Sequence, residues 1–207
     1  MMLFQRRRAL VVLVALGLMA ALGGLFLMTG PAKADASAVL AEGRTTVTDL
    51  AGRKVQVRLP VQRVILGEGR QLYLVAALDT DNPLKRIAGW RKDLIQSDPD
   101  TYRAYLRKFP GIADLPTFGG FEDGTFDIEQ AISLKPDVIV MNIEAQRATE
   151  DARYIEKLAA LGIPVVYVDF RHAPMENTEP TMRLFGKLFG KEQRAEAFIA
   201  FHNEQVK

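Results

Sequence analysis

The sequence contains no cysteine and only two histidines, His172 and His202. Without cysteine the chain cannot form a disulfide framework, a thiolate zinc site, an iron–sulfur cluster or a lipoprotein anchor. The two histidines lie thirty residues apart and cannot supply a three-histidine zinc site. We therefore expect no resident metal ion and no other cofactor.

Residues suited to covalent catalysis are also scarce. The chain has three serines, Ser37, Ser97 and Ser133, and none of them lies in a G-x-S-x-G motif. Glycines 119, 120 and 124 form a glycine-bearing loop, but they match neither a Walker A loop nor a G-x-G-x-x-G fingerprint. The sequence thus predicts a protein that is not an enzyme, with that loop serving as a close turn.

The first 36 residues differ from the rest of the chain. Arg6, Arg7 and Arg8 precede an apolar run to about residue 28, and small residues follow around Lys33 and Asp35. This pattern predicts a secretory signal peptide over residues 1–36, with an uncleaved membrane anchor as the alternative. These charged residues give the leader a net charge of +3. Because the whole chain has a formal net charge of +2, the remaining residues carry a net charge of −1. The remainder therefore shows no basic excess that would indicate a nucleic-acid partner.

Hydrophobic patterning predicts an α/β fold. After a linker at 37–44, alternation over 44–59 around Gly52 indicates a β-hairpin. Short apolar runs at 64–66, 84–90, 138–141 and 165–168 are typical of strands buried on both faces. Helical patterns occupy 71–78, 101–108, 128–134, 148–161, 181–188 and 191–207. This order predicts a doubly wound, mostly parallel sheet, in which ligands bind beyond the carboxyl ends of the strands.

Four segments taken together resemble the iron-complex and cobalamin periplasmic binding proteins of ABC importers. They are VTDLAGRKV at 47–55, RVI at 63–65, LKPDVIV at 134–140 and LGIPVVYVD at 161–169. The resemblance spans about residues 45–207. It implies a periplasmic protein that captures an iron complex, with a ferric siderophore as first choice and haem, cobalamin or an oxyanion left open. It also implies delivery to an ABC permease in the inner membrane.

Relatives of this kind have two α/β lobes joined by a long helix, with the ligand between them, and the complete protein is expected to be a monomer. On this pattern residues 45–180 form the N-terminal lobe, residues 181–207 begin the connecting helix, and the second lobe is absent. Two alternatives therefore stay open. One is a single-lobe fragment that binds no ligand, and the other is a secreted or anchored α/β enzyme.

The resemblance also assigns roles to particular residues. Glu129, next to the helix N-cap Asp127, matches the carboxylate that docks on permease arginines, although a favourable interaction with the helix dipole would also explain it. Phe118 matches an aromatic ligand contact and Trp90 offers a second stacking surface, with core packing as the alternative for such rings. The strand-end loops supply the remaining candidate ligand contacts, which are Glu68, Arg70, Arg91, Asn142, Glu144, Arg147, Arg171 and His172. Arginines suit an anionic chelate because guanidinium groups pair with oxyanions.

Overall fold

The computed structural model describes residues 43–206, so the predicted signal peptide and most of the linker lie outside the described residues. A hairpin of β1 (Arg44–Thr48) and β2 (Lys54–Arg58) comes first and is antiparallel. A five-stranded parallel sheet follows, built from β3 (Val64–Leu66), β4 (Ile87–Arg91), β5 (Thr117–Phe118), β6 (Val138–Asn142) and β7 (Val165–Val168). The predicted fold class is confirmed.

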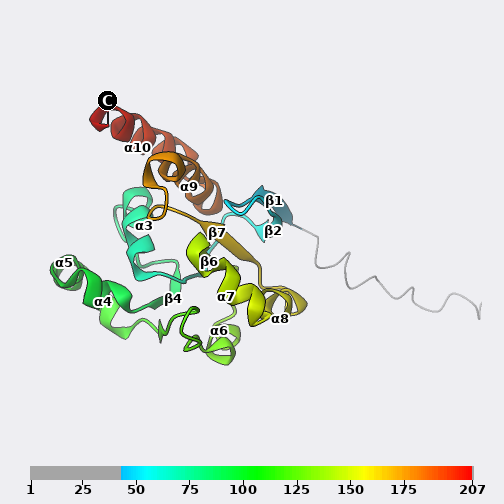
Figure 1. Cartoon of the computed structure of the whole chain (residues 1–207). Coiled ribbons are helices and arrows are strands. Elements are labelled where there is room, and N and C mark those ends of the chain that lie inside the picture. The colour runs from blue at the N-terminus through cyan, green and yellow to red at the C-terminus, as the bar shows by residue number, and fades with distance from the viewer. Residues whose placement is uncertain (1–42, 207) are drawn as a thin grey trace, which may run out of the picture. The chain divides into compact units, whose positions relative to one another are not determined.

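The strand order is β5-β4-β3-β6-β7. The chain therefore builds outward from β3 to β5, returns to the other side of β3, and continues through β6 to β7 (Figure 1). The pairs β3–β4 and β3–β6 are both parallel, and Leu66 lies opposite both Trp90 and Val140. The reversal of direction between β3 and β6 is the topological switch point, where doubly wound sheets bind ligands.

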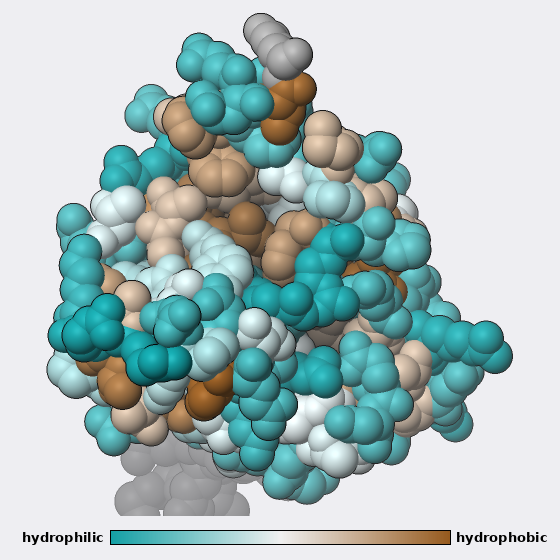
Figure 2. All heavy atoms as spheres, turned by 60° about the vertical axis from the view of Figure 1, so that its left-hand side comes forward, coloured by the Kyte–Doolittle hydropathy of each residue, from teal (hydrophilic) through white to brown (hydrophobic). Residues whose placement is uncertain are grey.

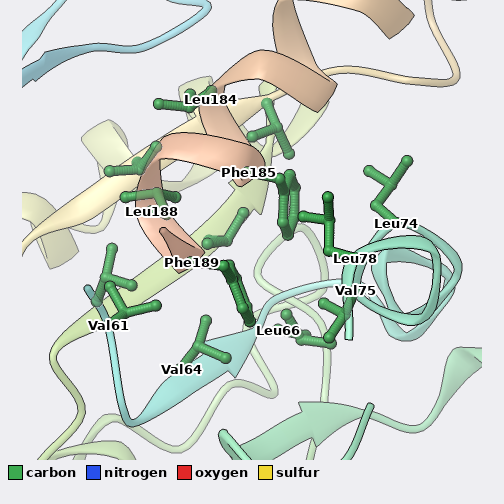
Figure 3. Close-up of a cluster of buried hydrophobic side chains, with 14 of the residues drawn as sticks. Val61, Val64, Leu66, Leu74, Val75, Leu78, Leu184, Phe185, Leu188 and Phe189 are labelled. Atoms are coloured by element: carbon green, nitrogen blue, oxygen red, sulfur yellow. The ribbon is translucent and has the colours of Figure 1, made fainter. Parts of the chain in front are cut away.

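Helices α3 (Leu72–Leu78), α9 (Pro174–Phe189) and α10 (Glu192–Gln205) cover one face of the sheet. Alternate strand residues such as Val64 and Leu66 pack there against Phe185 and Phe189 (Figure 3). The opposite face packs against α6 (Ile128–Ser133) and α8 (Tyr154–Ala160), with α7 (Gln146–Asp151) preceding α8. Burial on both faces explains why β3 and β7, and β6 up to Met141, are continuous apolar runs.

Two further α-helices and three 3₁₀ turns complete the described chain. Helices α4 (Asp93–Ser97) and α5 (Pro99–Lys108) follow β4. A groove of about 340 Å³ between α3 and α5 is lined in part by Ala76, Tyr105 and Phe109. Figure 2 views this side of the molecule, where apolar residues gather in a hollow surrounded by hydrophilic ones. The 3₁₀ turns η1 (Gly69–Gln71), η2 (Pro110–Asp114) and η3 (Ile143–Ala145) lie between regular elements.

The hairpin is fixed to the sheet by the motif VTDLAGRKV. Asp49 accepts hydrogen bonds from the backbone of Arg53 at 2.9 Å and from the backbone of Tyr167 at 3.2 Å. The guanidinium of Arg53 binds the same carboxylate at 2.7 Å, donates to the Val165 carbonyl at 2.8 Å and lies 4.3 Å from the centre of the Tyr167 ring. The aspartate and arginine of this motif therefore join the hairpin to β7.

Two predicted helices differ from the structure. The expected single helix over 148–161 is divided into α7 and α8, because Arg153 adopts a left-handed conformation with φ 55°. The helix expected from residue 181 begins at Pro174 and carries Pro180 in its interior. Proline at the first helical position costs no hydrogen bond, so Pro174 is a suitable start. Gly190, with φ 62°, then separates α9 from α10, as its position in the sequence indicated.

Among residues 43–206 no helix is both long enough and apolar enough to cross a membrane.

Candidate functional site

Polar and charged side chains from the ends of four strands meet at the switch point. We call six of these residues the strand-end network: Glu68 and Arg70 after β3, Asp93 after β4, Asn142 at the end of β6 with Glu144 after it, and Arg171 after β7. Because β3 and β6 are neighbours, the loops after them lie side by side at one edge of the sheet. The sequence predicted this gathering for all of the residues except Asp93.

Glu68 lies at the centre of the strand-end network. Its side chain is only 5% exposed, although it is surrounded by charged groups. Its Oε1 atom accepts a hydrogen bond from an Nη of Arg171 at 3.1 Å and forms an ion pair with an Nη of Arg70 at 2.7 Å. A single carboxylate oxygen therefore joins two guanidinium groups that come from opposite sides of the switch point.

Arg171 extends the strand-end network to β6. Its second Nη nitrogen binds Oε2 of Glu144 at 2.8 Å. The same Glu144 oxygen accepts from the side-chain nitrogen of Asn142 at 3.3 Å. The side-chain oxygen of Asn142 is buried and has no hydrogen-bond partner in the described structure. An unpaired buried acceptor is costly, so a donor group supplied from outside the strand-end network would be bound favourably there.

On the other side, Asp93 fixes the turn that carries Glu68. One of its oxygens accepts from the backbone nitrogen of Gly69 at 2.7 Å, and the other lies 3.6 Å from Nε of Arg70. Asp93 was not predicted, because the strand-end loop expected after β4 ended at Arg91, two residues earlier.

Burial determines the proton affinity of Glu68. The pKa of Glu68 is raised from 4.5 to about 7, chiefly by loss of solvation and to a smaller extent by the neighbouring carboxylates of Asp93 and Glu144. Arg70 and, more weakly, Arg91 act in the opposite direction. Glu68 is thus a carboxyl group that can change charge near neutral pH.

The glycine-bearing loop, residues 119–126, forms the adjacent part of the edge. Thr125 holds it closed, because its hydroxyl accepts from the backbone of Gly120 at 2.9 Å and donates to Asp123 at 2.6 Å. Arg91 binds Glu122 of this loop at 3.0 Å. A Cβ atom on Gly120 would lie 2.5 Å from an Nη of Arg91, so a larger residue there would require the end of the arginine side chain to shift. The expectation of a close turn is confirmed.

Two predicted aromatic contacts are turned inward, and their assignment as stacking surfaces is corrected here. Trp90 is 1% exposed and stacks on Tyr102 with 6.1 Å between ring centres. Phe118 is 3% exposed and stacks on Phe126 at 5.0 Å. Both rings project from strands whose two faces are covered, so each ring packs in the core instead of facing the open edge. Core packing, the alternative role for such rings, is what the structure shows.

Two other predicted contacts lie outside the strand-end network. The Arg147 side chain is 93% exposed on α7 and lies 3.7 Å from Asp151, one turn along the same helix. His172 is exposed, and the contact recorded for it is made by its backbone nitrogen, which donates to Asp169 at 2.8 Å. The structure therefore brings together five of the predicted ligand contacts, with Arg91 beside them, and leaves Arg147 and His172 at its margin.

Glu129 is exposed in the first turn of α6. The preceding Asp127 caps this helix by accepting from the backbone of Gln130 at 2.9 Å, as its sequence position predicted. The side chain of Glu129 is thus presented to solvent by a fixed helix start.

Other parts of the described chain offer weaker candidate sites. Residues 43–206 contain no group of three or more histidine, aspartate or glutamate side chains that could hold a metal ion. A cavity of about 350 Å³ lined in part by Asp79, Lys85 and Lys191 lies at the opposite edge, where α3 leads into β4. The strand-end network is therefore the candidate site, because it lies at the switch point and contains Glu68, a buried carboxyl group whose pKa is raised.

Comparison with known proteins places the chain in a family. A family model described as "Periplasmic binding protein" matches residues 87–207. No curated protein gives a significant match. Among solved structures, the TroA-like periplasmic binding protein FepB from Veillonella parvula is 30% identical, with a TM-score of 0.71 over 78% of this chain and 47% of that chain.

Two other solved structures share the fold at lower identity. The molybdate periplasmic binding protein MolA from Haemophilus influenzae is 21% identical, with a TM-score of 0.61 over 78% of this chain and 52% of that one. The petrobactin-binding protein YclQ from Bacillus subtilis is 21% identical, with a TM-score of 0.58 over 79% of this chain and 51% of that one. The chain spans about half the length of these relatives. Together with the parallel sheet and its strand order, the family match shows that this chain belongs to the periplasmic binding protein family.

Proposed function

We propose that the chain provides one wall of the ligand site of an ABC-importer binding protein, and that its ligand is a metal chelate, with a ferric siderophore as first choice. The observation that carries this proposal is the pair of arginines, Arg70 and Arg171, at the switch point of a fold shared with siderophore-binding and molybdate-binding proteins. Guanidinium groups bind the oxygens of catecholate, carboxylate and oxyanion ligands.

Delivery to a permease is the second part of the proposal. Glu129 is exposed at a rigid helix start and is suited to pair with a cation on another protein. Exposed ion pairs are weak one at a time, so its contribution would be to orientation and to the rate of encounter. The protein would act outside the inner membrane, as the names of its relatives indicate for them.

One observation favours the alternative of a lobe that binds no ligand. Arg70, Arg91 and Arg171 each already pair with a carboxylate of the same lobe. An anionic ligand must therefore compete with these internal partners.

A thermal-shift screen separates the two readings. The purified chain is heated with a ferric tricatecholate, a ferric trihydroxamate, haem, cobalamin or molybdate. A ligand present at about 100 times its Kd stabilises the folded state by about 2.7 kcal/mol, and a domain of this size then melts about 5 °C or more higher. A rise with one ligand class supports the proposal, and loss of that rise in Arg171→Ala but not in Arg147→Ala locates it at the strand-end network. No rise with any ligand supports the non-binding lobe.

A further inference from the structure

The strand-end network already contains the anion that its arginines would otherwise seek. Glu68 lies beneath Arg70 and Arg171, with 5% of its side chain exposed against 28% and 34% for theirs. The two guanidinium groups are therefore partly open to solvent on one side and bound to a buried carboxylate on the other. A ligand that approaches from solvent reaches the arginines before it reaches Glu68.

The charges of the strand-end network do not favour an anionic ligand as they stand. Three carboxylates, Glu68, Asp93 and Glu144, face the two arginines, which gives a formal charge of −1. The neighbouring pair of Arg91 and Glu122 is neutral and leaves that value unchanged. An anion that bound without any other change would thus bring more negative charge to an edge that is already negative. Uptake of one proton would remove this obstacle.

Glu68 is the carboxylate best placed to take up that proton. It is the most buried of the three, since the side chains of Asp93 and Glu144 are 17% and 34% exposed. Five charged groups act on Glu68. Arg70 and Arg171 bind it directly, while Asp93, Glu144 and Arg91 act through space. Once a ligand occupies the arginines, Glu68 loses the two partners that stabilise its charge, and its neutral form is favoured further.

We propose that Glu68 is an internal anion that occupies Arg70 and Arg171 in the ligand-free protein, and that an anionic ligand takes its place while the Glu68 carboxylate binds one proton. The inference rests on the proposed function and deepens it, because it names the residue that couples ligand capture to pH. The only bond formed is the O–H bond on Glu68, and the proton comes from solvent. Burial that raises the pKa of Glu68 to about 7 supports this exchange near neutral pH.

The exchange defines the class of ligand. The ligand must present an oxyanion able to accept from two guanidinium groups that now share one oxygen atom, as a catecholate or carboxylate oxygen of a metal chelate can. A cationic ligand would leave Glu68 charged and would bind without proton uptake. A hydrogen-bond donor on the same ligand would additionally satisfy the buried oxygen of Asn142.

The test measures binding of a synthetic ferric tricatecholate by titration calorimetry at about pH 6 and about pH 8. Wild type, Glu68→Gln and Glu122→Gln are compared, each in two buffers of different ionisation enthalpy. Glu122→Gln is the matched control because it removes a carboxylate from an exposed arginine pair at the same edge. The pH dependence of the chelate itself is common to all three proteins and cancels in their ratios.

At about pH 8 we expect wild type and Glu122→Gln to bind the tricatecholate about tenfold more weakly than Glu68→Gln does. At about pH 6 the ratio of their dissociation constants to that of Glu68→Gln should fall toward one. We also expect wild type to take up about one proton more than Glu68→Gln at the higher pH. Equal affinities and equal proton uptake in all three proteins would overturn the inference while leaving the proposed function intact. Absence of binding in all three would overturn both. Should Glu68→Gln not fold, proton uptake by wild type decides: about one proton supports the exchange, and none rejects it.

Discussion

Arg171 reaches from the loop after β7 to Glu68 in the loop after β3, with 3.1 Å between its Nη1 and the Glu68 Oε1. The two residues are 103 positions apart in the chain, and the parallel sheet alone brings them together. Because β6 lies between β3 and β7, this ion pair spans the switch point, which is where folds of this type bind ligands.

The stability of wild type relative to Glu68→Gln should depend on pH. The native carboxyl has a pKa of about 7 against 4.5 ordinarily, so between these values the folded state holds a proton that the unfolded state has lost. Its stabilising contribution is fully present below about pH 4.5 and is lost as the pH rises through about 7. One pKa unit corresponds to about 1.4 kcal/mol, and screening by solvent reduces the effect. We therefore expect the unfolding free energy of wild type, relative to Glu68→Gln, to fall by about 2 kcal/mol as the pH rises over this range.

Urea unfolding of both proteins at intervals from about pH 4 to about pH 8 measures this difference, because the other titrating groups are common to both. A difference in unfolding free energy that stays constant over the whole range would show that the pKa of Glu68 is the same in the folded and unfolded states, and would contradict this prediction.

Removing the Arg171 side chain should weaken ligand binding. Arg171→Ala leaves one guanidinium where two now converge and exposes Glu68 and Glu144 to an incoming anion. Charge-assisted contacts of this kind are worth about 1.5–3 kcal/mol, so we expect a loss of about 10- to 100-fold in affinity for a ferric tricatecholate. Arg147→Ala removes an arginine that is 93% exposed and should leave the affinity unchanged. Equal losses in the two variants would mean that bulk charge, not the strand-end network, attracts the ligand.

Much of the fold could be predicted because its signals are local. Continuous apolar runs marked the buried strands, and Asp127 with Gln130 marked the start of α6. The division between α7 and α8 could not be predicted, because Arg153 carries no glycine-like or proline-like signal for its left-handed backbone. The two-residue strand β5 was likewise missed, since it exists only through its pairing with β4.

The position of the candidate site was predicted from the sequence, but the pairing of its charged side chains was not. The strand-end rule requires only knowledge of where parallel strands finish, which explains why Glu68, Arg70, Glu144 and Arg171 were selected. Which side chains pair depends on their reach across three loops, and no sequence pattern encodes it. For the same reason Trp90 was assigned to the open edge: the face of a strand that a ring occupies is set by packing, here against Tyr102.

Asp169 should be essential for the turn that presents Arg171. It is fully buried after β7, and its carboxylate accepts from the backbone nitrogens of Arg171, His172 and Ala173 at 2.8–3.0 Å. Asp169→Ala would leave these donors without partners at once. We expect unfolding to become easier by about 2–4 kcal/mol, measured by urea titration. Asp151→Ala, at an exposed pair on α7, is the matched control and should show no change. Similar stabilities for the two variants would contradict the role given to the turn.

Reversing the charge of Glu129 should affect delivery alone. Glu129 is exposed at the start of α6, while Asp127, not Glu129, accepts the capping hydrogen bond, so Glu129→Lys should preserve the fold and ligand affinity. If Glu129 pairs with a permease cation, the variant should stimulate ATP hydrolysis by its permease in vesicles about fivefold less, because like charges hinder productive docking. Glu156→Lys, an exposed carboxylate on α8, supplies the same change of net charge elsewhere. Equal stimulation by both variants would remove Glu129 from the docking surface, whereas a loss confined to Glu129→Lys would place α6 against the permease.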